Sequence, residues 1–201
     1  MNQERTEYIL KILYKIFKDG YRPARGNESY CKKLKNGLYV GNMINCMGHI
    51  FNLRNQQFDD YKIEPYKIFS HGYAYPYFTG FMKDAYKYDE SAKLMLDFIR
   101  EVGLKVEECY PNEKISDFKS WKIALYFSSR DFHYLLEDNQ KNWSSKVGNK
   151  NIVEQISGEE PPKEYQNHVD TFPILYNLYA TYKITNKNAD ENNKYVADRH
   201  M

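Results

Sequence analysis

The chain has 201 residues, with 29 basic and 27 acidic side chains and a formal net charge of +2. This balance gives no global field that would draw the protein to nucleic acid or to a membrane surface, and no apolar run approaches the ~20 residues of a membrane-spanning helix. The three cysteines are odd in number and widely spaced, which argues against a disulfide framework and predicts a reducing, cytoplasmic setting.

The composition is typical of a single globular domain, with 42% hydrophobic and 28% charged residues. We expect this α+β domain to span residues 1–184 and residues 185–201 to be a disordered tail, because few apolar residues follow Thr185. The chain holds 22 Lys and 18 Asn against 7 Arg. Since Lys and Asn have AT-rich codons, the bias suggests a low-GC bacterium or one of its mobile elements as the source.

Apolar residues recur at helical spacing in three segments of the first half, with charged residues between them. Gly20 and Gly103 are placed to end the first and third of these helices, and Asn45 can cap the second. The predicted helices span residues 6–18, about 46–56, and from Asp89 or Ser91 to about Val102.

The second half changes to strand-like patterns separated by turn residues. Residues 138–141 predict the turn of a hairpin, and residues 148–170 a polar loop. The predicted strands span residues 121–127, 132–137, 142–147 and 174–184. Helices followed by antiparallel strands indicate an α+β fold.

Cys46 lies at the start of the second predicted helix, where backbone N–H groups can stabilise an oxyanion. His133 lies inside a predicted strand, and Asp131 can share its face. A helix terminus and an imidazolium both favour thiolate over thiol, so the pair predicts a thiol nucleophile with a histidine base. Each residue alone also fits a structural role, Cys46 as a small core residue and His133 as a polar group on a strand.

Two segments carry a family resemblance. Residues 45–52, Asn-Cys-Met-Gly-His-Ile-Phe-Asn, resemble an Asn-Cys-aromatic-small-x-x-Leu-Asn opening. Residues 131–134 and 143–148, Asp-Phe-His-Tyr and Trp-Ser-Ser-Lys-Val-Gly, resemble an Asp-x-His-aromatic strand followed by Trp-Ser-His-Lys-x-Gly. Together they resemble a group of small bacterial papain-like cysteine hydrolases, over residues 40–56 and 121–184. The resemblance implies N-terminal helices, including a nucleophile helix, packed on a C-terminal antiparallel sheet that carries the histidine.

The residue that orients the imidazole is left open by this resemblance. Ser145 stands where the family motif has a second histidine, and a hydroxyl would orient the ring less well. An Asn or an acid is wanted to hold the histidine tautomer, and Asn142, Asn151 and Glu154 are the candidates. We favour Asn151 or Glu154 over Asn142, and assign Asn45 with Asn142 to a second, oxyanion or orienting, role.

No cofactor or metal is expected. Cys46 and His49 could share an ion on one helix, but zinc needs two further ligands, and the other cysteines and His71 are not at paired spacing. The glycine-rich motifs of nucleotide-binding loops are absent from the sequence.

Residues 58–88 are rich in tyrosine and phenylalanine and predict an irregular, aromatic loop region. Tyr73, Tyr75 and Tyr77 alternate, so they could point the same way in an extended segment. We expect them, with Trp143, to form a wall of a substrate cleft or a contact surface for a protein partner.

The expected function is that of a cysteine hydrolase which cleaves a peptide or isopeptide bond of a peptide or protein substrate through Cys46 and His133. Acyl transfer and glutamine deamidation remain open, because they share the first step. The alternative is a non-enzymatic inhibitor of mobile-element or phage type that binds a host protein through the tyrosine-rich region.

Overall fold

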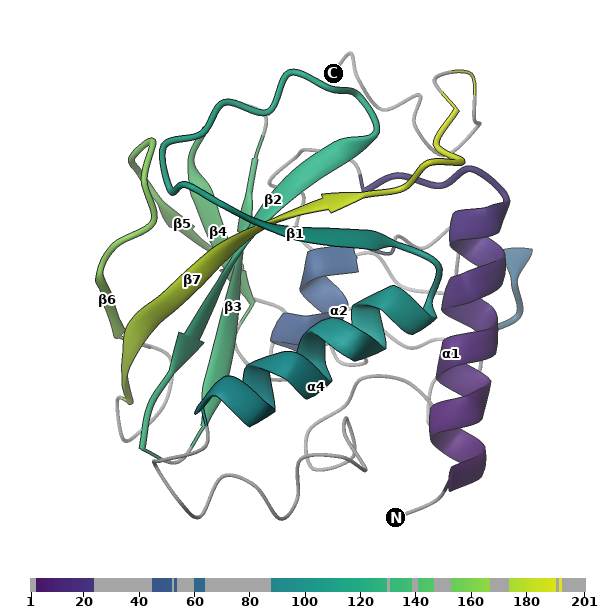
Figure 1. Ribbon diagram of the computed structural model, residues 1–201, viewed down its shortest axis with the longest axis horizontal. Coiled ribbons are helices and arrows are strands. Elements are labelled where there is room, and N and C mark those ends of the chain that lie inside the picture. Colours follow the sequence, from purple (N-terminus) through teal and green to yellow (C-terminus); the bar gives the residue numbers. More distant parts are fainter. Residues whose placement is uncertain are drawn as a thin grey trace.

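Within the described residues, three helices precede a single antiparallel sheet (Figure 1). The structure is a computed structural model and describes residues 3–23, 45–51, 53, 60–63, 88–129, 131–138, 141–146, 153–166, 174–190 and 192. The helices are α1 (Gln3–Lys18), α2 (Cys46–Phe51) and α4 (Tyr88–Glu101). Each coincides with a predicted helix, although α2 ends at Phe51 and not near residue 56.

The sheet has the strand order β1-β7-β2-β3-β4-β5, and β6 pairs with β7 as well. Its strands are β1 (Lys105–Cys109), β2 (Ser120–Phe127), β3 (Phe132–Glu137), β4 (Trp143–Lys146), β5 (Val153–Ile156), β6 (Glu164–Gln166) and β7 (Leu175–Thr185). The predictions of β2, β3, β4 and β7 are confirmed. β1, β5 and β6 are additions, and the last two lie in the region predicted to be a loop.

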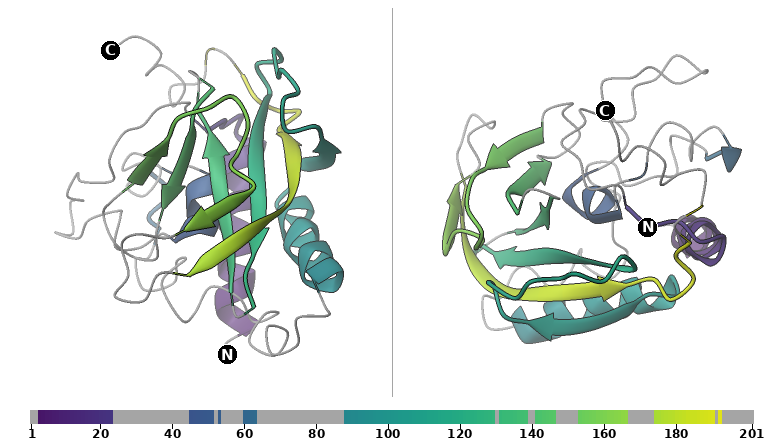
Figure 2. Two further views of the ribbon diagram at one scale, coloured as in Figure 1. Left: turned by 90° about the vertical axis from the view of Figure 1, so that its left-hand side faces the viewer. Right: turned by 90° about the horizontal axis from the view of Figure 1, so that it is seen from above.

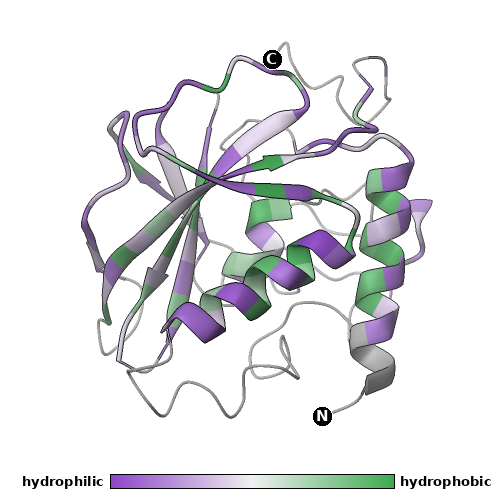
Figure 3. Ribbon diagram, in the orientation of Figure 1, coloured by the Kyte–Doolittle hydropathy of each residue, from purple (hydrophilic) through white to green (hydrophobic). Residues whose placement is uncertain are grey.

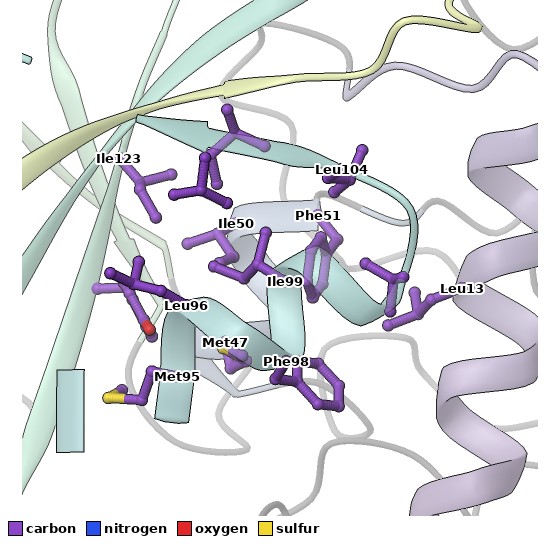
Figure 4. Close-up of a cluster of buried hydrophobic side chains, with 14 of the residues drawn as sticks. Leu13, Met47, Ile50, Phe51, Met95, Leu96, Phe98, Ile99, Leu104 and Ile123 are labelled. Carbon is purple, nitrogen blue, oxygen red and sulfur yellow. The ribbon is translucent and has the colours of Figure 1, made fainter. Parts of the chain in front are cut away.

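The helices pack on this sheet through apolar faces. Apolar and polar residues alternate along α1 and α4 (Figure 3). Figure 4 shows side chains of α1, α2 and α4 gathered with Ile123 of β2 in the larger of two cores. The indole N–H of Trp121 donates to the backbone carbonyl of Ile50 at 3.1 Å, which fastens α2 to β2.

The sheet is strongly twisted and curved (Figure 2), with α2 in contact with β3 and β4 and α4 with β1. A second, smaller core includes Leu135, Trp143 and Tyr165. Since side chains alternate along a strand, β3 contributes Tyr134 and Leu136 to the larger core and Leu135 to the smaller one. β3 therefore separates two differently lined faces.

The described chain includes residues after Thr185, where the sequence suggests a tail. Asn186 is fully buried, and its side-chain amide donates to the backbone carbonyls of Phe17 at 2.9 Å and Tyr21 at 2.6 Å. Residues after the last strand thus hold the end of α1.

The α+β prediction, with helices packed against a C-terminal antiparallel sheet, is confirmed; the papain-like assignment stays a prediction. No helix in the described part of the chain has the length and apolar character needed to cross a bilayer.

Candidate functional site

The candidate site begins at the first residue of α2. The side-chain oxygen of Asn45 accepts hydrogen bonds from the backbone N–H groups of Met47 at 3.1 Å and Gly48 at 3.2 Å. This is an N-cap, so Asn45 fixes where the helix starts. Cys46 is therefore held in the first turn, as the sequence predicts.

A second histidine anchors α2 to the sheet. His49 Nε2 lies 2.9 Å from the Ser144 hydroxyl, which itself donates to the Leu136 carbonyl at 3.2 Å. Ser144 therefore accepts the proton of His49 Nε2. With this nitrogen engaged, His49 is a structural residue of the interface between α2 and β4. No group of three or more potential metal ligands occurs among the described residues.

The thiol of Cys46 is buried, with 7% of the residue exposed. Burial, together with the nearby Asp131 carboxylate, raises the pKa of the Cys46 thiol to about 12. The backbone N–H of Tyr134 and the ammonium group of Lys146 act in the opposite direction without offsetting burial. Burial therefore opposes the resting thiolate that the sequence predicts, and with this pKa the thiol is neutral near pH 7.

His133 lies on β3 among aromatic rings of the smaller core. Its imidazole stacks on Tyr165 with ring centroids 5.1 Å apart and lies 5.3 Å from the ring of Tyr176. Burial lowers the pKa of His133 to about 3, and the nearby Lys146 charge acts in the same direction. The imidazole is consequently neutral at physiological pH.

A chain of hydrogen bonds runs from His133 across three elements. His133 Nε2 lies 2.7 Å from the Ser145 hydroxyl, which lies 2.7 Å from the hydroxyl of Tyr165. Tyr165 in turn donates to Glu154 Oε2 at 2.5 Å. β4 contributes Ser145, β6 contributes Tyr165 and β5 contributes Glu154. The hydrogen-bond chain therefore depends on the sheet being assembled.

The direction of this chain follows from its carboxylate end. Because Tyr165 donates to Glu154, its oxygen accepts the proton of Ser145, and Ser145 then accepts a proton from His133 Nε2. The imidazole proton therefore resides on Nε2, and Nδ1 carries the lone pair. Glu154, a predicted orienting residue, acts through two hydroxyls, and Ser145 makes the direct contact.

The remaining predicted residues have different places. Asn142 belongs to the β3–β4 turn, where its backbone N–H donates to Asp138 at 2.9 Å and its side chain accepts from Gly158 at 3.4 Å. Trp143 is fully buried in the smaller core, which removes it from a contact surface. Asn151, Tyr73, Tyr75 and Tyr77 lie outside the described residues.

Cys46 and the side chain of His133 lie on opposite sides of β3. Cys46 packs in the larger core with Tyr134, the residue after His133, and no hydrogen bond within the described ranges joins the thiol to the imidazole. A Cys46 thiolate would nevertheless raise the pKa of Tyr165 and Tyr176, which flank His133. The thiol thus lies within electrostatic reach of both faces of the strand.

Sequence reasoning missed Tyr165 and Lys146 as residues of this region. Tyr165 is the buried residue of a three-residue strand between the exposed side chains of a glutamate and a glutamine, so no run of apolar residues marks it.

No protein-family model, curated protein or solved structure matches the chain.

Proposed function

We propose that the protein is a thiol-dependent hydrolase of peptide or isopeptide bonds in which Cys46 is the nucleophile and His133 the base. The proposal is supported chiefly by the hydrogen-bond chain from His133 through Ser145 and Tyr165 to Glu154, which leaves Nδ1 of the imidazole as an acceptor. A base held in one tautomer by a partner on the next strand is what a nucleophile–base pair requires.

In this mechanism the thiol is neutral before attack, so it loses its proton as it reacts. The sulfur of Cys46 bonds to the substrate carbonyl carbon, and the carbonyl π electrons move to its oxygen. The thiol proton passes to His133 Nδ1, a transfer that requires the two side chains, which lie on opposite sides of β3 in the structure, to come within hydrogen-bond distance. The tetrahedral intermediate then collapses, the C–N bond breaks, and the proton returns to the leaving amine. Water attacks the resulting thioester, giving the acid and the free thiol.

A panel of fluorogenic peptide and isopeptide substrates tests this proposal. Cys46→Ala should abolish turnover, and His133→Ala should reduce kcat by about 100-fold or more, the usual contribution of a positioned base. Cys109→Ala is the matched control, because Cys109 is a half-buried thiol at the end of β1. Turnover that survives Cys46→Ala contradicts the proposal.

The burial of Cys46 favours a second candidate, a non-enzymatic binding protein that uses the same fold as a scaffold. A thiol with a pKa of about 12 and an imidazole with a pKa of about 3 are also what two core residues would have. In that case Cys46→Ala would lower the free energy of unfolding without changing the affinity for a protein partner recovered with the wild-type chain.

A further inference from the structure

A buried lysine shares the face of the sheet on which Cys46 lies. β3 and β4 pair Leu135 with Ser145, so one step further along this register Tyr134 lies opposite Lys146. Residues directly opposite each other in an antiparallel pair point to the same face. Tyr134 belongs to the larger core together with Cys46, and Lys146 therefore points to that side.

The docking of α2 supports this placement independently. Ser144 lies on the face of β4 that bonds His49, one helical turn after Cys46. Lys146 follows Ser144 by two residues and therefore points to the same side of β4. Lys146 is fully buried.

The surroundings of this lysine are those of a polar site within an apolar core. The Tyr134 hydroxyl is completely buried and has no hydrogen-bond partner in the part of the chain that the structure describes. Burial raises the pKa of this phenol, and charge on Cys46 would raise it further. Burial lowers the pKa of Lys146 to about 8, and a Cys46 thiolate would oppose that shift.

We propose that Lys146 is a further residue of the Cys46 site, whose ammonium group stabilises the Cys46 thiolate from the α2 side of the sheet. His133 faces the other side of β3 and is neutral, so it supplies no charge to the resting thiol. The catalytic meaning of Lys146 rests on the proposed hydrolase, whereas its effect on the thiol does not. Lys146 thus stabilises the charge on Cys46, whereas His133 is the proposed base.

Charged and titratable groups on both sides of β3 surround the thiol. Asp131 precedes β3 and opposes the thiolate, and Lys146 of β4 favours it. His133 and Tyr134 come from β3, and the phenols Tyr165 of β6 and Tyr176 of β7 sense the same thiol. The Asp131 carboxylate accepts a hydrogen bond from Tyr176 at 3.0 Å. Lys146, with a pKa of about 8, loses its charge within the pH range of the test.

The test uses the full chain with Cys31→Ser and Cys109→Ser, so that Cys46 is the remaining thiol. Its rate of alkylation by iodoacetamide is measured from pH 6 to pH 10.5 in three forms: Lys146, Lys146→Met and Lys146→Arg. Met keeps the length and apolar stem of the side chain, and Arg keeps a charge that does not titrate in this range.

The alkylation rates of the three forms should differ in opposite ways at the two ends of the pH range. Near pH 7 the Lys146→Met variant should react about tenfold or more slowly than the parent, since an adjacent opposite charge is worth one or more pKa units, and Lys146→Arg should resemble the parent. Near pH 10 the parent has lost its ammonium charge, so its alkylation rate should approach that of Lys146→Met. The Lys146→Arg variant should then react about tenfold faster than either of them.

Two outcomes overturn the proposal: equal rates for the parent and Lys146→Met near pH 7, or a constant ratio of Lys146→Arg to the parent across the range. The second comparison holds even if Lys146→Met does not fold. His133→Gln should preserve the difference between Lys146 and Lys146→Arg, and its loss there would assign the charge effect to the other face. If the expected rate pattern is found but no substrate is turned over, the proposed hydrolase activity is rejected and the effect of Lys146 on the thiol stands.

Discussion

Ser145 is the residue on which the candidate site depends most directly. In the motif that this chain resembles, a histidine would stand at its position, yet the serine hydroxyl here bonds both His133 and Tyr165. It therefore relays the orientation that a single larger side chain would provide. The neighbouring Ser144 makes an equally buried bond on the opposite face, to His49.

This pair of serines gives a matched prediction. Ser145→Ala and Ser144→Ala should each lower the free energy of unfolding by about 1–3 kcal/mol, because each leaves buried polar partners unsatisfied. Only Ser145→Ala should change the tautomer of His133, which ¹⁵N NMR of the imidazole reports directly. A His133 spectrum altered equally by both changes would contradict the directional chain.

The neutral state of His133 predicts how stability depends on pH. Its pKa in the folded protein, about 3, is below the ordinary value of 6.5, so between these values the unfolded chain binds a proton that the native protein does not. The contribution of His133 to stability is therefore present above about pH 6.5 and is lost as the pH falls toward 3.

Urea unfolding at a series of pH values measures this effect. His133→Gln removes the titrating group, so its stability should fall less steeply between pH 6.5 and pH 4 than that of the wild type. The difference between the two proteins cancels the carboxylates common to both. Parallel profiles would mean that the imidazole is accessible to protons in the folded state.

At the scale of the elements, α2 is too short to be stable alone, since isolated helices need about 12–15 residues. Its six residues are held by the Asn45 cap, the His49 bond and the indole of Trp121. The position of Cys46 is thus set by contacts with the sheet more than by helical propensity.

A comparison of two tryptophans tests this dependence on tertiary contacts. Trp121→Phe removes the N–H that bonds Ile50, whereas Trp143→Phe removes a buried N–H without a partner among the described residues. Trp121→Phe should destabilise the protein by about 1–3 kcal/mol more than Trp143→Phe. Hydrogen exchange of the α2 amides should accelerate only in Trp121→Phe.

The sequence predicted those elements whose burial pattern is local. The amphipathic spacing of α1 and α4 and the apolar run of β2 are visible in the chain itself. β1, with the sequence Lys-Val-Glu-Glu-Cys, is mostly exposed and becomes a strand because β7 pairs with it. β5 and β6 are also short, and they too become strands because neighbouring strands, β4 and β7, pair with them.

The site was predictable to a similar degree. Cys46 and His133 are proposed from their motifs and Glu154 from its chemistry, and Glu154 lies at the end of the hydrogen-bond chain from His133. The contact between Tyr165 and Ser145 joins two strands that are not neighbours in the sheet, so no local pattern encodes it. The burial that keeps Cys46 neutral is likewise a property of the packed helices and sheet.

At the scale of the whole molecule, the chain after β7 fastens α1 to the sheet. The side-chain amide of Asn186 donates to carbonyls of the last turn of α1 and of Tyr21, which follows the helix, and the Asp190 N–H donates to the Gly20 carbonyl at 3.3 Å. These bonds connect segments that are more than 160 residues apart, since Asn186 and Phe17 are separated by 169 positions.

Asn186→Ala should therefore lower the free energy of unfolding by about 1–3 kcal/mol, because it removes two buried hydrogen bonds to backbone carbonyls. Asn188→Ala is the control, because the side chain of Asn188 is exposed. Urea unfolding that gives the same midpoint for both variants would show that the anchor contributes nothing.

The position of β7 has a consequence for biosynthesis. β7 lies between β1 and β2 and also pairs with β6, so three strands made earlier on the ribosome lack a neighbour until it emerges. Non-local pairing of this kind slows folding and leaves strand edges and apolar surface open to association in the meantime. A nascent chain stalled before residue 175 should thus bind chaperones persistently, whereas one released after residue 190 should not.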